Sequence, residues 1–89
     1  MRIEADHPAL AGHFPGRPVI PGVVLLDRIA ALAELAGLGQ LRRIAMLKFL
    51  SPALPEQVLE LQIEREGMRA RFAVKRDGQT ILRGEGEMT

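Results

Sequence analysis

The feature that most restricts the fold of this chain is an apolar segment at residues 21–37, PGVVLLDRIAALAELAG. The segment opens with a proline, is rich in leucine and alanine, and ends in glycine. Proline is favoured in the first turn of a helix and glycine just past its end, so we predict a helix over 21–37. Only Asp27, Arg28 and Glu34 interrupt its apolar surface. A helix that is apolar nearly all round is typical of a protein interior, so the remaining residues must supply what covers it.

The second half of the chain has the pattern of an antiparallel sheet. Four stretches are interpreted as strands: 41–50, 57–65, 69–76 and 79–88. The last three alternate apolar and polar residues, which is typical of half-exposed strands. Glu66-Gly67 and Asp77-Gly78 separate them, and Asp-Gly between alternating runs favours a tight hairpin. Before the helix, residues 2–5 are interpreted as a short strand and residues 6–20 as a loop. We therefore predict one α+β domain over 1–89, in which a curved antiparallel sheet holds a long central helix.

The composition argues against several classes of function. The 12 basic and 11 acidic side chains nearly balance, and the aromatic residues are three phenylalanines, so a nucleic-acid interface is not expected. The lack of cysteine excludes disulfides, thiolate metal sites and cysteine nucleophiles, and it fits a reducing, cytoplasmic location. No signal-peptide pattern opens the sequence, and no uncharged apolar stretch reaches the roughly 18 residues of a membrane span.

The segment HFPGRPVIPG at 13–22 and the helix after it carry three groups suited to acid–base chemistry. The imidazole of His13 is a good general base near neutral pH. Asp27 has apolar neighbours three and four residues away, and a carboxylate among them is costly without a partner or water. Gly22 lies in the first turn of the helix, where backbone N–H groups lack intrahelical acceptors.

Each of these residues also has a plain structural interpretation. His13 could brace its loop through a backbone carbonyl, Asp27 could be solvated at a rim, and Gly22 could merely relieve crowding. Together they suggest elimination of water from a 3-hydroxyacyl thioester, which needs a base, an acid and a donor to the carbonyl oxygen. His7 is interpreted as an ordinary loop residue. Zinc binding by the two histidines would need a third ligand, so no metal site is expected.

The stretch GHFPGRPVIPGVVLLD closely resembles the active-site segment of bacterial 3-hydroxyacyl-[acyl-carrier-protein] dehydratases, and weaker similarity continues at LKFLSPALPEQVLEL. The resemblance implies a hot-dog fold, His13 as the catalytic histidine, Asp27 as the catalytic acid and Gly22 as the amide donor. It also implies an active site at a homodimer interface, which would explain why Asp27 has no local partner. The substrate would be carried on the phosphopantetheine of acyl carrier protein, with no further cofactor. The residues that would hold the loop are Phe14, Pro15, Pro18 and Pro21.

Three departures from the family weaken the substrate assignment more than the reaction class. Asp27 stands where fatty-acid-elongating members carry glutamate, and it resembles the dehydratase/isomerase branch and short aryl-polyene-type members. The chain is shorter than typical members and is expected to lack an N-terminal strand and helix. The residues LPEQ at 54–57 replace a Pro-Gly turn.

Two other functions stay open: a non-catalytic acyl-binding or scaffold subunit, and an acyl thioesterase.

Acyl carrier proteins are acidic, so a basic patch on this chain could dock one. The same side chains could equally form a solvated basic face. They are Arg17, Arg42, Arg43 and Lys48.

Overall fold

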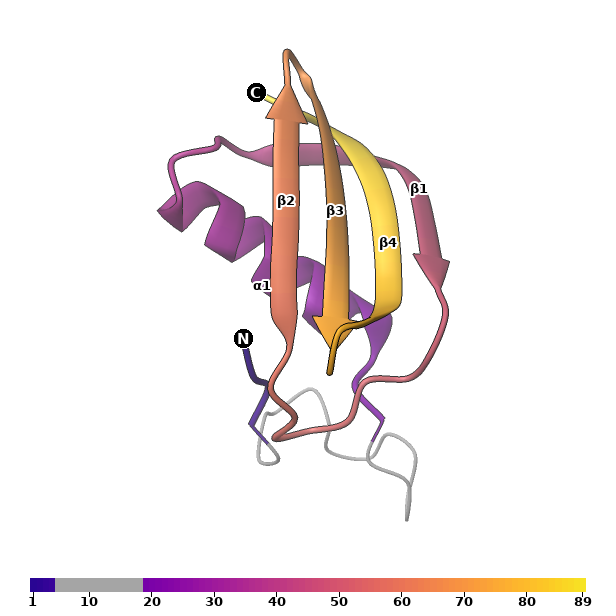
Figure 1. Cartoon of the computed structure of the whole chain (residues 1–89). Coiled ribbons are helices and arrows are strands. Elements are labelled where there is room, and N and C mark those ends of the chain that lie inside the picture. Colours follow the sequence, from indigo (N-terminus) through magenta and orange to yellow (C-terminus); the bar gives the residue numbers. More distant parts are fainter. Residues whose placement is uncertain (5–18) are drawn as a thin grey trace.

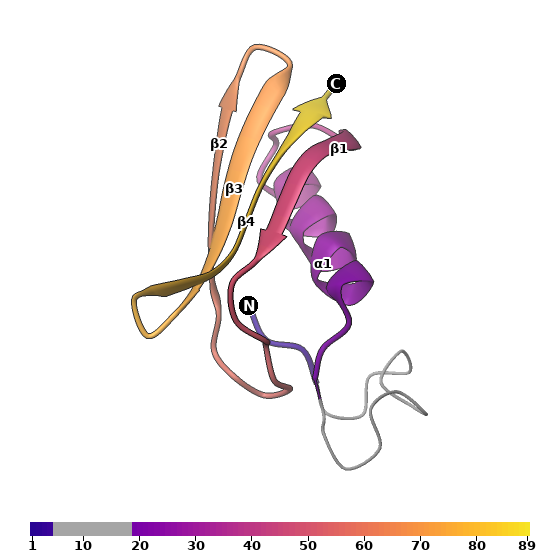
Figure 2. The same ribbon diagram turned by 90° about the vertical axis from the view of Figure 1, so that its right-hand side faces the viewer.

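The computed structural model describes residues 1–4 and 19–89. Its elements are α1 (Gly22–Leu35), β1 (Leu41–Phe49), β2 (Glu60–Glu66), β3 (Arg69–Arg76) and β4 (Gln79–Met88). The strands form an antiparallel sheet in the order β1-β4-β3-β2. Helix α1 crosses one face of this curved sheet, and the other face carries no helix (Figures 1 and 2). The α+β prediction is therefore confirmed, while the single domain over 1–89 stays a prediction.

Local chemistry explains where α1 begins and ends. Pro21 is extended, with φ −59° and ψ 143°, and its carbonyl accepts the first helical bond from Val24 N–H at 3.0 Å. At the other end Gly37 has φ 77°, its N–H donates to Glu34 O, and Leu38 N–H donates to Ala33 O, both at 3.0 Å. These two bonds are the Schellman pattern that a left-handed glycine allows. The helix thus lies within the predicted span.

Two short turns connect β2, β3 and β4. Asp77 and Gly78 have φ of 52° and 78°, as a type I′ hairpin requires, and Gly67 has φ 61° in the preceding turn. Both predicted hairpins are confirmed. Strand β2 begins later than predicted, because residues 54–57 form a turn in which Gln57 Oε1 accepts a hydrogen bond from Leu54 N–H at 3.0 Å.

The N-terminal residues extend the sheet edge without being assigned as a strand. Leu59 N–H donates to Met1 O and Glu56 N–H donates to Ile3 O, each at 2.8 Å. Ile3 is fully buried. The predicted strand at 2–5 is therefore an extended, hydrogen-bonded segment as far as the structure describes it.

The core lies between α1 and the sheet face that it crosses. Leu25 and Ile29 of α1 pack in one cluster with inward-facing residues of β3 and β4. The members from the two strands are Phe72, Val74, Ile81 and Leu82. Among the described residues α1 is covered on the side that faces the sheet, whereas Val23 is 62% exposed and Leu35 is 83% exposed. The predicted arrangement, a curved antiparallel sheet that holds one long helix, is confirmed. No helix among the described residues is long and apolar enough to cross a membrane.

Candidate functional site

The first turn of α1 offers backbone donors that no described group uses. Gly22 is the first helical residue, and no side chain caps this end. Within residues 1–4 and 19–89, the N–H groups of Gly22 and Val23 donate to no protein acceptor. The helix dipole also favours negative charge here. These donors can therefore stabilise an oxygen that gains negative charge.

An apolar pocket of about 400 Å³ lies beside the first of these donors, because Gly22 is one of its lining residues. One wall comes from the start of α1 and the residues before it, and the other from the end of β1 and the residues after it. Among the described lining residues Ser51 supplies the only side-chain hydroxyl, and none of them is charged. The lining residues are Val19, Ile20, Pro21, Gly22, Leu25, Phe49, Leu50, Ser51, Pro52 and Ala53. Such a lining suits the hydrocarbon part of a ligand rather than a charged group.

Phe49 explains why position 22 is glycine. A Cβ on Gly22 would lie 2.6 Å from Cζ of the Phe49 ring, closer than real Cβ contacts come. The interpretation that this glycine relieves crowding therefore has direct support. It is compatible with the donor interpretation, because Phe49 and Gly22 line the same pocket. Phe49 belongs to the pocket, although no local pattern in the sequence marks it as a site residue.

Asp27 lies on the uncovered side of α1. Its side chain is exposed, and within the described residues its carboxylate makes no ion pair and accepts no hydrogen bond. Arg28 is directed elsewhere, donating to Arg2 O at 3.3 Å and lying 3.9 Å from the carboxylate of Glu4. In the single chain Asp27 is therefore solvated.

Three exposed apolar residues share the helix face of Asp27. They lie at intervals of four residues along the helix: Val23 precedes Asp27, and Ala31 and Leu35 follow it. This spacing puts side chains on one face of a helix. We call these three residues and Asp27 the α1 stripe. A partner that covers the α1 stripe would remove Asp27 from water.

Several predicted residues lie outside the described part of the chain. These are His7, His13, Phe14, Pro15, Arg17 and Pro18. The pairing of His13 with Asp27 and the role of the loop therefore stay predictions. Pro21 lines the pocket, and the N–H of Ile20 donates to Ala53 O at 2.9 Å, which holds the end of the loop segment against the pocket wall. Among the described residues, histidine, aspartate and glutamate form no group of three that could hold a metal.

The three described cations proposed for docking do not form one compact patch. Arg42 and Arg43 lie at the start of β1 and Lys48 near its end, about 17–20 Å apart at the usual rise of a strand. Arg43 is paired with Glu87 at 3.2 Å. Lys48 lies opposite Arg83 of β4 in the sheet register, which places two cations side by side. Arg83 was not among the residues predicted for docking.

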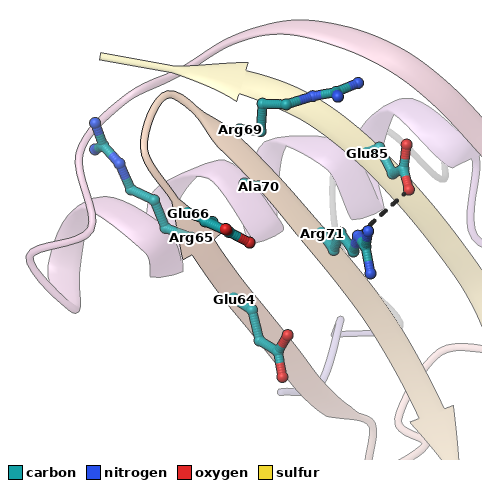
Figure 3. A pocket seen from close by; sticks show the side chains of 7 residues that line it. All are labelled: Glu64, Arg65, Glu66, Arg69, Ala70, Arg71 and Glu85. Atoms are coloured by element: carbon teal, nitrogen blue, oxygen red, sulfur yellow. Dashed lines mark ion pairs between the residues drawn. The ribbon is translucent and has the colours of Figure 1, made fainter.

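A larger hollow, of about 560 Å³, lies over the sheet and is lined mostly by charged residues. Figure 3 shows the side chains of Glu64, Arg71 and Glu85 on the face turned away from α1. Arg71 stands between the other two in the register and lies 3.5 Å from Glu85. Because these charges compensate one another, this hollow has the character of a solvated sheet face. The apolar pocket beside Gly22 is the better candidate site.

Comparisons with known proteins identify the family of this chain. A family model described as ApeI-like, ApeI dehydratase, matches residues 1–85. The 3-hydroxyacyl-[acyl-carrier-protein] dehydratase FabZ of Alkaliphilus metalliredigens is 34% identical over 76 residues, which cover 75% of this chain and 52% of that protein. The FabZ of Erythrobacter litoralis is 35% identical over 92 residues, covering 88% of this chain and 61% of that protein. This chain thus spans about half to two thirds of these curated relatives.

Two solved structures are similar over 99% of this chain. One is a chain of the dehydratase heterocomplex ApeI:P from Xenorhabdus doucetiae, with a TM-score of 0.85, 27% identity and 81% of that chain covered. The other is an uncharacterised protein from Erwinia carotovora subsp. atroseptica, with a TM-score of 0.80, 28% identity and 77% covered. The predicted hot-dog architecture is thereby confirmed.

Proposed function

This chain belongs to the ApeI-like dehydratase family, and we propose that it is a hydro-lyase acting on a 3-hydroxyacyl thioester carried by acyl carrier protein. The product would be the trans-2-enoyl thioester and water. The observation that carries the proposal is the apolar pocket lined by Gly22, whose N–H donates to no described acceptor. A thioester needs this combination, a hydrocarbon site beside a donor to its carbonyl oxygen.

The proposed chemistry uses His13, Gly22 and Asp27. The imidazole of His13 removes a proton from C2, and the electron pair left behind forms the C2–C3 double bond. The N–H of Gly22 donates to the carbonyl oxygen as it gains negative charge. The protonated carboxyl group of Asp27 gives its proton to the C3 hydroxyl, so the C3–O bond breaks and water leaves. The pantetheine arm belongs to the substrate, and no further cofactor is proposed.

A second copy of the chain would complete the site. The α1 stripe leaves apolar side chains and Asp27 exposed together, and burial against a partner would cover both. We propose that the partner contributes His13 to the Asp27 of this chain, in a homodimer or a higher homo-oligomer. Burial of a carboxyl group favours its neutral form, which a general acid requires. The cysteine-free composition supports a cytoplasmic location.

A purified protein assay tests the reaction. Wild-type protein should convert a 3-hydroxyacyl thioester to the conjugated enoyl thioester, and His13→Ala or Asp27→Asn should lower turnover about 10²–10⁴-fold with the oligomer intact. Unchanged rates in both variants would refute the roles assigned to these residues. Release of free thiol from an acyl thioester would instead indicate thioester hydrolysis.

A non-catalytic subunit is the second candidate function. It is favoured by the exposure of the α1 stripe, and by the solved relative from Xenorhabdus doucetiae, which is a heterocomplex. In this case the chain would bind acyl groups or hold another subunit. Dehydration by the chain alone would exclude this role, and turnover only after addition of a second subunit would establish it.

A further inference from the structure

Arg76, the last residue of β3, holds the connection between β1 and β2. Its Nη1 donates to Pro52 O at 2.8 Å and to Gln57 Oε1 at 3.2 Å, and its Nη2 donates to Ser51 Oγ at 3.1 Å. Among the described residues no carboxylate pairs with Arg76. The donors of this guanidinium are therefore used on neutral acceptors of a single connection.

That connection is one wall of the apolar pocket. Ser51 and Pro52, which Arg76 contacts, both line the pocket. The start of the wall is also fixed by the main chain, because the N–H groups of Leu50 and Ser51 donate to Ile81 O at 2.8 and 3.2 Å. Without Arg76 the wall would keep its attachment to β4, but Pro52 would lose the only described side chain that fixes its carbonyl.

The turn after the wall depends on Arg76 as well. Gln57 Oε1 accepts hydrogen bonds from both Arg76 and Leu54 N–H. Glu56, which lies between Leu54 and Gln57 in this turn, has φ 67°. Residues other than glycine adopt such a positive φ only when their surroundings enforce it. The guanidinium of Arg76 therefore helps to hold this wall of the pocket in a shape that the residues of the 54–57 turn would not favour by themselves.

We propose that Arg76 is a positioning residue that sets the depth of the acyl pocket and thereby the chain length of the preferred substrate. The inference rests on the proposed function, because it takes the pocket as the site of the acyl chain. The planar guanidinium spans three acceptors at fixed angles, whereas a lysine ammonium is a compact point charge on a flexible stem. Charge alone would not reproduce the wall.

Arg65 of β2 offers a matched control. It donates to Gly67 O at 2.7 Å, to Thr89 O at 2.9 Å and also to Leu38 O. It is thus a second arginine that joins separate parts of the backbone, but it lies at the opposite end of the sheet from Arg76 and lines no part of the apolar pocket. A general loss of rigidity should affect both arginines alike, whereas a change in the pocket should follow Arg76 alone.

The test compares Arg76→Gln, Arg76→Lys and Arg65→Gln with wild type. Turnover is measured on straight-chain 3-hydroxyacyl thioesters of increasing length, and binding of the matching non-reactive acyl thioethers is measured by calorimetry. One methylene in an apolar pocket changes selectivity about 10–200-fold, so Arg76→Gln should change the long-to-short ratio of kcat/KM about tenfold. The change should appear in KM for long chains, while kcat for short chains stays within about twofold. Arg76→Lys should change the ratio in the same direction, and Arg65→Gln should leave it unchanged.

Equal ratios in wild type and Arg76→Gln, or equal changes in Arg76→Gln and Arg65→Gln, would overturn the inference. A wild-type profile in Arg76→Lys would also overturn it, because the charge would then suffice. Arg76→Lys carries the test if Arg76→Gln does not fold. The thioether affinities separate the two proposals. If wild type binds thioethers in a length-dependent way without turnover, the reaction is refuted. An unchanged length dependence of binding in Arg76→Gln then overturns the role of Arg76, and a changed one supports it.

Discussion

The ring of Phe49 occupies the space that a side chain on Gly22 would need, with 2.6 Å between a Cβ at position 22 and Cζ of the ring. Gly22 begins α1 and Phe49 ends β1. Their close approach joins the start of the helix to the end of the strand beside the apolar pocket. Any residue larger than glycine at position 22 must displace the ring or the helix.

Gly22→Ala should therefore destabilise the fold by about 0.5–1.5 kcal/mol, the cost of forcing a side chain off its rotamer, because the Phe49 ring is 48% exposed and can turn aside. The free energy of unfolding is obtained from urea titration. In the background of Phe49→Ala the same substitution should cost much less, because the clashing ring is gone. An equal cost in both backgrounds would show that the ring is not what limits position 22.

Mixed dimers should reveal whether the active site is shared. If His13 of one protomer acts with Asp27 of the other, a dimer of His13→Ala and Asp27→Asn chains has one intact site out of two. Random exchange makes half of the dimers mixed, so activity should recover to about a quarter of wild type. The measurement is turnover after unfolding and refolding the two inactive variants together.

Each variant refolded alone is the control, and it should stay inactive. If the mixture also stays inactive while native mass spectrometry detects mixed dimers, His13 and Asp27 of the same protomer act together.

The α1 stripe should be covered in the oligomer. Val23→Lys places a charge in the stripe beside Gly22, and we expect the dimer to dissociate at protein concentrations where wild type is dimeric, because burying an unpaired charge is costly. Sedimentation velocity measures the change. Met68→Lys is the matched control, since Met68 is 65% exposed and Val23 is 62% exposed, but Met68 lies in the β2–β3 turn. Dissociation by both variants, or by neither, contradicts the predicted interface.

We expect Lys48 to contribute to carrier-protein binding and, at the same time, to lower the stability of the sheet. It faces Arg83 across β1 and β4, and like charges directly opposite each other are destabilising. Lys48→Glu should therefore stabilise the fold by about 0.2–1 kcal/mol, while it weakens the affinity for an acidic carrier at low salt. Thermal unfolding and carrier titration measure the two effects.

Arg69→Gln serves as the control for docking, because Arg69 lies between Glu66 and Glu87 in the register. It should leave carrier affinity unchanged. If Lys48→Glu also leaves the affinity unchanged, the carrier does not dock at this end of β1. Charge reversal at Arg17, Arg42 and Arg43 then tests the three remaining predicted cations.

Local patterns were sufficient for most of the fold. The Asp77-Gly78 and Glu66-Gly67 signals gave the correct hairpins, because a tight turn needs backbone angles that few residues other than glycine adopt. Strand β2 was placed three residues too early because Gln57 looks like the start of an alternating strand. Its side chain is instead used by Leu54 N–H and Arg76, and both contacts depend on how the turn folds back.

The sequence by itself determined the α1 segment, the hairpins and the residue types suited to acid–base chemistry, since these depend on spacing and on neighbours a few residues away. Only the tertiary structure decided which of them meet. In the fold, Phe49 and residues 50–53 lie beside Gly22, and Arg76 donates to three acceptors in one connection. Lys48 lies far from Arg42, and among the described residues Val23 and Leu35 of α1 stay exposed. The physical reason is that these contacts join residues far apart in the chain, so the curvature of the sheet and the packing of α1 fix them, and no local pattern records either.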